Sequence, residues 1–184
     1  MKGKMVLDWN VVITVREEGF SRAFVLLEQF GPVSRTEFFN VLVMRVDDIP
    51  NLLEALRHHI EKDPEVETIL ARLVPASHVF TFRTPEEFKT KASEGVCIWV
   101  PELAGRRFHV RMHRRGFKGR LASMAEEQFL DEVLLNALEK SGHPGLINFD
   151  DPDVIVSVET VAQRAGLSFW NREDRQRYPF LHLD

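Results

Sequence analysis

Residues 105–120 read Gly-Arg-Arg-Phe-His-Val-Arg-Met-His-Arg-Arg-Gly-Phe-Lys-Gly-Arg. Two sets of side chains alternate in its first half: Phe108, Val110 and Met112 in one, and Arg107, His109, Arg111 and His113 in the other. Side chains of a β-strand project to opposite faces with a period of two residues. The alternation therefore predicts a strand with one face in a core and a second face that presents cations.

The same stretch, which we call the basic segment, concentrates positive charge. It holds seven lysine and arginine residues and no acidic residue, whereas the whole chain of 184 residues has a formal charge of −4. The remainder of the chain is therefore acidic. A local array of this kind suits polyanions, above all nucleic-acid backbones. The alternative is an ordinary solvated face, and the absence of interspersed acids argues against it.

The second half of the basic segment is where we expect the closest contacts. Arginine guanidinium groups bind phosphate oxygens bidentately and stack on bases, and Gly116 lets the backbone approach a ligand. His109 and His113 either contact the ligand or simply occupy an exposed strand face, and Phe117 is a candidate platform for base stacking. The predicted binding residues are Arg107, His109, Arg111, His113, Arg114, Arg115, Gly116, Phe117, Lys118 and Arg120.

Residues before the basic segment predict a small alternating unit. Apolar and turn residues suggest strands at 9–16, 33–36, 39–46 and 66–74, a helix at 19–30 and another that begins at Asp48. Asp48 is a good N-cap, and the leucines that follow it lie on one helical stripe. The order β-α-β-β-α-β is the split βαβ or ferredoxin-like arrangement. We therefore predict a ferredoxin-like domain over residues 1–74.

Residues 75–184 predict a second α/β domain, which makes the fold class α+β. Thr84 and Glu87 form a capping-box pattern at the start of one helix, which we expect to end near Gly95. Ser123 and Glu126 form a second such pattern at the start of another helix. Strands are predicted at 154–160 and 167–171.

Several segments of this second domain, taken in order, resemble the THUMP domain, an RNA-binding module of tRNA-modifying proteins. They are residues 108–120, the helix that begins at Ser123, residues 147–159 and residues 166–170. The resemblance covers residues 75–184 and implies a THUMP-like α/β fold, which a ferredoxin-like domain usually precedes. It also implies that the two domains contact the acceptor stem and 3′ end of tRNA. The bound tRNA would then be presented to a catalytic partner.

Catalytic motifs are not found. There is no Walker loop, no His-Glu-x-x-His, no dinucleotide fingerprint and no zinc-deaminase signature. Cys97 is the only cysteine, and Asp150-Asp151-Pro152-Asp153 is better explained as a turn than as a magnesium site. We therefore expect no catalytic residue, no cofactor and no metal, and predict that the protein is not an enzyme.

The resemblance also suggests partners, because no methyltransferase or pyrophosphatase loop follows the THUMP-like region. The analogue is the stand-alone THUMP protein that assists a separate tRNA cytidine acetyltransferase. We expect tRNA or another structured RNA and a separate RNA-modifying enzyme as partners. Met1–Asp8 lacks the apolar core of a signal peptide, and no apolar run is long enough for a membrane span, so a cytoplasmic location is expected.

Two other classes of function remain open at this point. One is an enzyme that acts on a nucleotide or a phosphorylated metabolite and binds its phosphates with the basic segment. The other is an interaction module that docks an acidic protein partner.

Overall fold

The computed structural model describes residues 6–184, which form two compact units. The first unit holds the chain up to Pro75 together with Gln176–His182, and the second holds Ala76–Arg175 with Leu183–Asp184. Each unit combines helices with its own sheet, so the predicted α+β class is confirmed. Over residues 6–184, every helix is too short or too polar to cross a membrane. The expectation about a signal peptide falls partly on residues 1–5, outside the described residues.

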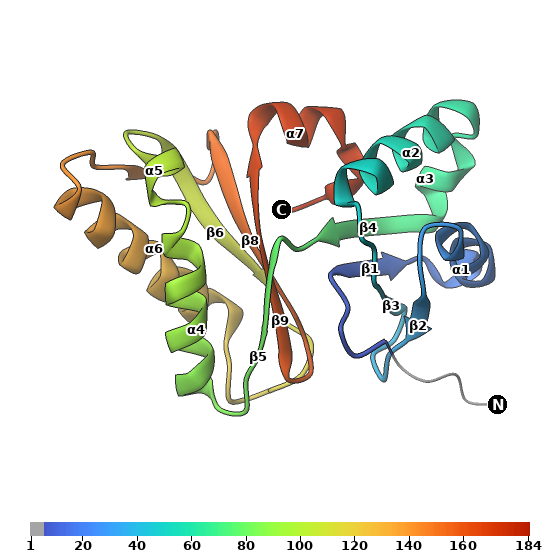
Figure 1. Cartoon of the computed structure of the whole chain (residues 1–184), viewed down its shortest axis with the longest axis horizontal. Helices are drawn as coiled ribbons and strands as arrows, with labels where there is room; N and C mark the ends of the chain where they lie inside the picture. Colours follow the sequence, from blue (N-terminus) through green and yellow to red (C-terminus); the bar gives the residue numbers. More distant parts are fainter. Residues whose placement is uncertain (1–5) are drawn as a thin grey trace. The chain divides into compact units, whose positions relative to one another are not determined.

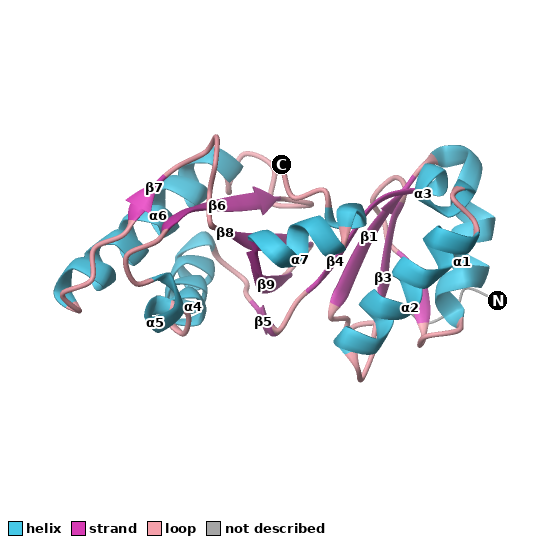
Figure 2. Ribbon diagram, turned by 90° about the horizontal axis from the view of Figure 1, so that it is seen from above, coloured by secondary structure: helices cyan, strands magenta, loops and turns pink. Residues whose placement is uncertain are grey.

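The first unit is built on a four-stranded sheet with the order β2-β3-β1-β4, in which all neighbours are antiparallel. Its strands are β1 (Val11–Val15), β2 (Val33–Arg35), β3 (Val41–Met44) and β4 (Leu70–Pro75). Its helices are η1 (Glu17–Gly19), α1 (Phe20–Glu28), α2 (Ile49–Lys62), α3 (Glu65–Ile69) and η2 (Pro179–Leu181). Apart from the short helices, the order is the βαββαβ arrangement (Figure 1; Figure 2 shows α1 and α2 beside the sheet).

A side-chain cap explains where helix α2 begins. The Asp48 side chain accepts a hydrogen bond from the Asn51 amide at 3.0 Å, which satisfies one orphan donor at the start of α2. The predicted strand at 66–74 begins too early, because residues up to Ile69 form α3. Asp63 Oδ1 accepts from the Glu65 amide at 3.2 Å, and this turn starts a helix where the apolar pattern alone suggested a strand.

The segment Gln176–His182 is part of the first unit. The Tyr178 hydroxyl donates to Glu54 at 2.6 Å, and Arg177 donates to both oxygens of the same carboxylate at 2.6 and 3.0 Å. The hydrogen bonds from Arg177 and Tyr178 hold the pKa of Glu54 well below its usual range. Phe180 is buried, so apolar packing adds to these polar contacts.

The second unit contains a five-stranded mixed sheet with the order β5-β9-β8-β6-β7. Its strands are β5 (His78–Thr81), β6 (Arg107–His113), β7 (Leu146–Ile147), β8 (Val154–Val161) and β9 (Arg164–Asn171). Its helices are α4 (Pro85–Cys97), α5 (Val100–Leu103) and α6 (Ser123–Lys140), and α7 (Arg172–Arg177) follows β9. Strand β6 is parallel to β7 and β8, whereas β9 is antiparallel to β5 and β8.

The apolar half of the basic strand enters the core as predicted. Phe108, Val110 and Met112 are buried on the face that α4 and α6 cover (Figure 1). The helices meet this face with Leu130, Leu134 and Leu138 from α6 and with Phe88, Ala92 and Val96 from α4.

Gly95 does not end α4, which continues to Cys97. A Cβ atom at Gly95 would lie 2.4 Å from Leu167 Cδ1, so glycine is needed here for the close approach of α4 to β9. The expectation that Gly95 ends the helix was therefore wrong. This glycine instead lies where the helix packs closely against the sheet.

The capping box predicted at Ser123 and Glu126 is absent. Ala122 is the N-cap of α6, and no side chain caps the helix there. Glu126 is buried and forms an ion pair with Lys89 of α4. The carboxylate is thus used for a contact between two helices, which the local motif could not reveal.

Helix α6 also completes the hydrogen bonding of β6. The Val110 amide donates to Asp131 Oδ1 and the Met112 amide donates to Glu127 Oε1, each at 2.8 Å. Strand β7 pairs with β6 only at Arg107 and Phe108. The two carboxylates therefore take the place of a longer neighbouring strand.

Asp131 makes the stability of the fold depend on pH. Burial raises the pKa of Asp131 from 3.8 to about 7, although the bond from the Val110 amide opposes this. Because the folded state binds the extra proton, this group's stabilising contribution is complete below pH 4 and is lost as the pH rises through 7. Between pH 5 and 8, wild type should lose about 2 kcal/mol more of its free energy of unfolding than Asp131→Asn does. The asparagine keeps an oxygen acceptor but does not titrate. Urea unfolding across this pH range measures it, and an unchanged pH profile would contradict it.

Candidate nucleic-acid interface

The structure divides the basic segment into the strand β6 and the turn that follows it. We call residues 114–120 the basic turn. The strand is seven residues long, so Arg107 at its start lies about 20 Å from the basic turn.

Arg107, at the start of the strand, is neutralised by acids. Its guanidinium lies 3.0 Å from Asp151 and 3.1 Å from Asp153, and Arg172 pairs with the same two carboxylates. The hydrogen bond from the Arg107 side chain, with one from its amide, holds the pKa of Asp153 well below its usual range. The aspartates predicted as a turn thus anchor two arginines.

The cationic face expected along β6 is only partly open to solvent, and its charges are paired or buried. His109 is 0% exposed, and its ring centroid lies 5.2 Å from that of Phe149. Burial lowers the pKa of His109 and favours the neutral imidazole. Arg111 donates to the Asp184 carboxylate at 3.3 Å. The expectation that this face presents free cations is therefore wrong, and the reason is burial and pairing.

Arg115 has a structural role. Its guanidinium lies 2.6 Å from Glu159, and the side chains are only 12% and 1% exposed. His113 Nδ1 is 3.6 Å from the same carboxylate. The Arg115 amide also donates to Thr160 Oγ1 at 3.1 Å, and the Ala162 amide donates to the Arg115 carbonyl at 2.9 Å. These contacts tie the start of the basic turn to the β8–β9 hairpin.

The basic turn contains three residues with left-handed backbone. Gly116, Phe117 and Gly119 have φ values of 96°, 55° and 79°. Left-handed backbone suits glycine but is uncommon for a large side chain. Phe117 is held in it because its ring packs 5.0 Å from that of Phe82 and its carbonyl accepts hydrogen bonds from the amides of Arg120 and Leu121.

Three of the remaining four cations of the basic segment lie on this turn, and the fourth, Arg106, precedes β6. Lys118 and Arg120 are exposed, and the Arg120 guanidinium lies over the Phe117 ring at 4.8 Å. Arg114 is partly exposed and donates to the Gly116 carbonyl. Within residues 6–184, no carboxylate lies within the 4.0 Å of an ion pair from these three side chains. The structure thus keeps three cations together without neutralising them.

The hairpin that supports the turn was not predicted from the sequence. Strands β8 and β9 are separated by two residues, Ala162 and Gln163, and Ala162 has a φ of 53°. Two apolar strands separated by so short a link are a hairpin signal. This signal was present in the sequence, although Ala162 is not a typical turn residue.

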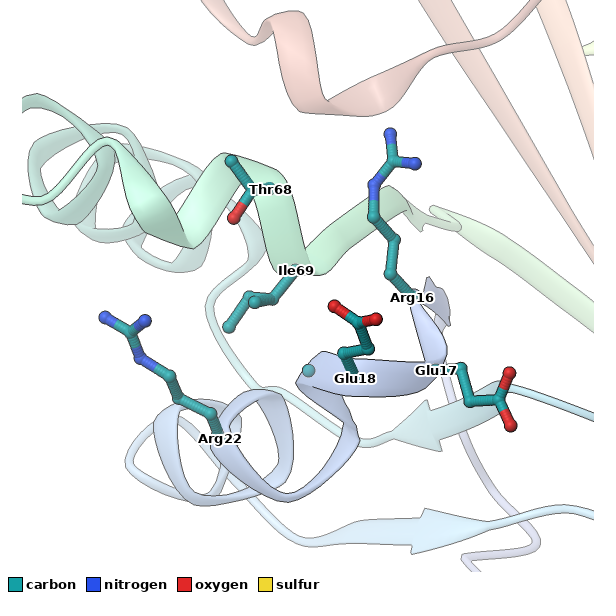
Figure 3. Close-up of a pocket in the computed structure, with 7 residues that line it drawn as sticks. Arg16, Glu17, Glu18, Arg22, Thr68 and Ile69 are labelled. Carbon is teal, nitrogen blue, oxygen red and sulfur yellow. The ribbon is translucent and has the colours of Figure 1, made fainter.

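A separate pocket of about 630 Å³ lies in the first unit (Figure 3). Figure 3 shows Glu18 between Arg16 and Arg22. Arg22 also pairs with Asp63 at 2.5 Å and Glu65 at 3.0 Å. Acids therefore balance the cations of this pocket, and it is a weaker candidate for a polyanion than the basic turn.

Comparisons with sequences give no assignment. No family model matches the chain, and no curated protein matches it significantly.

Comparisons with solved structures identify the fold. PH1313 from Pyrococcus horikoshii Ot3 matches 88% of this chain and 55% of its own, with a TM-score of 0.57 and 14% identity. A 4-thiouridine synthetase in complex with RNA and ATP matches 89% of this chain and 42% of its own (TM-score 0.52, 13% identity). A possible methylase from Clostridium difficile 630 matches 88% and 40% (TM-score 0.53, 12% identity).

These matches show which fold the chain has. The chain spans about half the length of the structures it matches, and it shares its fold with an enzyme solved in complex with RNA. At this level of identity the likeness establishes the fold alone.

The expectation that the protein is not an enzyme is contradicted by the same matches. They include a synthetase and a possible methylase, so the fold occurs in enzymes. The lack of a familiar catalytic motif in the sequence was too weak a basis for that expectation.

Proposed function

We propose that this chain is a THUMP-like RNA-binding module that holds structured RNA, foremost tRNA, for a modification enzyme in the cytoplasm. The observation that carries this proposal is the basic turn, where Arg114, Lys118 and Arg120 gather without a carboxylate partner among the described residues. The proposal narrows the site predicted from sequence, because Arg107, His109, Arg111, His113 and Arg115 are paired or buried.

The chemistry of the turn suits a phosphate backbone. Arginine forms two parallel hydrogen bonds to phosphate oxygens, and lysine acts as a point charge. Contacts of this kind fix the position of a nucleic acid without reading its sequence, and folded RNA is recognised largely by shape.

The structural neighbours support the RNA partner and the enzymatic context. The synthetase was solved with RNA, and this chain matches 42% of it. In the proposal, the module binds and orients the RNA, and a partner enzyme modifies the bound RNA. Together with the THUMP resemblance, the fold favours this function over binding of a small phosphorylated metabolite or of an acidic protein.

Filter binding with three RNAs tests the proposal: intact tRNA, tRNA that lacks its 3′ end, and a duplex of equal length. We expect a preference for intact tRNA and a salt dependence of about two to three log units of affinity per log unit of salt, as for three phosphate contacts. Equal, weak binding to all three RNAs would reduce the interaction to generic electrostatics and contradict the proposal.

A further inference from the structure

The Phe117 ring, predicted to stack on a base, is already engaged. Its centroid lies 5.0 Å from that of Phe82, and the Arg120 guanidinium carbon lies 4.8 Å from its centroid. A nucleobase could stack on the face that Arg120 covers only by displacing that side chain. The outermost group of this stack is therefore the guanidinium of Arg120.

Arg120 is well placed to receive a planar ligand. It is exposed, and no carboxylate among residues 6–184 pairs with it. Its amide donates to the Phe117 carbonyl at 2.9 Å, so the backbone that carries the side chain is fixed. A guanidinium is planar and weakly hydrated, and it can stack with aromatic groups on both of its sides.

We propose that Arg120, supported by Phe117, is a stacking site for an unpaired nucleobase of the bound RNA. The inference rests on the proposed function and adds one specific contact to it: an unpaired base stacked on the Arg120 guanidinium. A base inside a duplex has both faces stacked on its neighbours, whereas an unpaired base can be splayed out onto a protein group. Arg114 and Lys118 hold the adjoining phosphates.

The other cations of the turn are unsuited to this role. The guanidinium of Arg114 is bound to the Gly116 carbonyl, which ties it to the base of the turn. Lys118 carries a compact ammonium group without a plane. Arg120 is therefore the residue of this turn to replace by lysine. The substitution should remove stacking and keep the positive charge.

The test compares wild type with Arg120→Lys on two RNAs. One is a hairpin with a short single-stranded extension that contains 2-aminopurine, and the other is the same hairpin with a blunt end. Wild type should prefer the extended hairpin, and binding should change the 2-aminopurine fluorescence. Arg120→Lys should bind the extended hairpin about tenfold more weakly and lose the fluorescence change. Its affinity for the blunt hairpin and its salt dependence should remain, because the charge is kept.

Arg106→Lys is the matched control, since Arg106 is exposed and lies outside the basic turn. It should behave as wild type on both RNAs. If wild type prefers the extended hairpin and Arg120→Lys keeps both the preference and the fluorescence change, the stacking site is wrong and the proposed function stands. If wild type binds both hairpins equally, the stacking site is wrong and the preference for a free RNA end that the proposed function requires fails as well. If wild type binds neither RNA, the proposed function itself fails.

Discussion

Replacement of Arg114, Lys118 and Arg120 by alanine is expected to reduce the affinity for tRNA by at least about 100-fold near physiological salt. The three side chains are the unneutralised cations of the basic turn, so each is free to release counterions from the RNA. The slope of log affinity against log salt should fall by about two to three, at about 0.7–0.9 for each phosphate that is no longer bound. A filter-binding series over several salt concentrations measures both quantities.

A control with the same change in net charge separates a local site from a global field. Lys62, Arg106 and Lys140 are exposed residues outside the basic turn. Their joint replacement by alanine should change affinity only slightly, and both triple variants should unfold near the wild-type temperature, because exposed substitutions usually change stability little. Equal reductions of affinity in the two variants would mean that the basic turn is not the binding site.

Arg115→Ala is expected to lower the free energy of unfolding by about 3–5 kcal/mol. The guanidinium lies 2.6 Å from Glu159, whose side chain is 1% exposed. Removing one member of a buried ion pair leaves the other charge desolvated and poorly compensated. The loss should appear in urea unfolding as a lower midpoint with an unchanged slope.

A double variant identifies the cause of the instability expected for Arg115→Ala. Arg115→Ala combined with Glu159→Gln should be more stable than Arg115→Ala alone, because a neutral amide is less costly to bury than an unpaired carboxylate. His113, 3.6 Å from Glu159, remains in both variants. If the double variant is less stable than the single one, the instability does not come from an uncompensated Glu159.

Periodicity made the sheet of the second unit predictable, but it could not show which polar groups meet. Phe108, Val110 and Met112 alternate with polar residues, and this local pattern placed them in the core. Glu159, in contrast, lies 44 residues from Arg115, and no local rule links them. His109 was expected on an exposed face because a strand pattern does not show what covers its second side. The basic turn therefore remains the candidate binding site. Most of the binding residues that were predicted on strand β6 are paired or buried.

Short elements were missed for a related reason. Strand β7 has two residues, too few for any periodicity, and its pairing with β6 depends on the fold. The helix α3 was assigned to a strand because its apolar residues fit both patterns. The turn in which the Glu65 amide donates to Asp63 Oδ1 precedes this helix and left no apolar signal in the sequence.

The hydrogen bonds that Asp131 and Glu127 accept from amides of β6 protect this strand against pairing with another chain. An unpaired strand edge is a template onto which another chain can add its own strand, which is a common start of aggregation. Here the Val110 and Met112 amides, which such an intruding strand would need, are already bonded at 2.8 Å to side chains of the same unit. Helix α6 thus occupies the donors of this edge that an added strand would need, although β7 covers only the first two residues of β6.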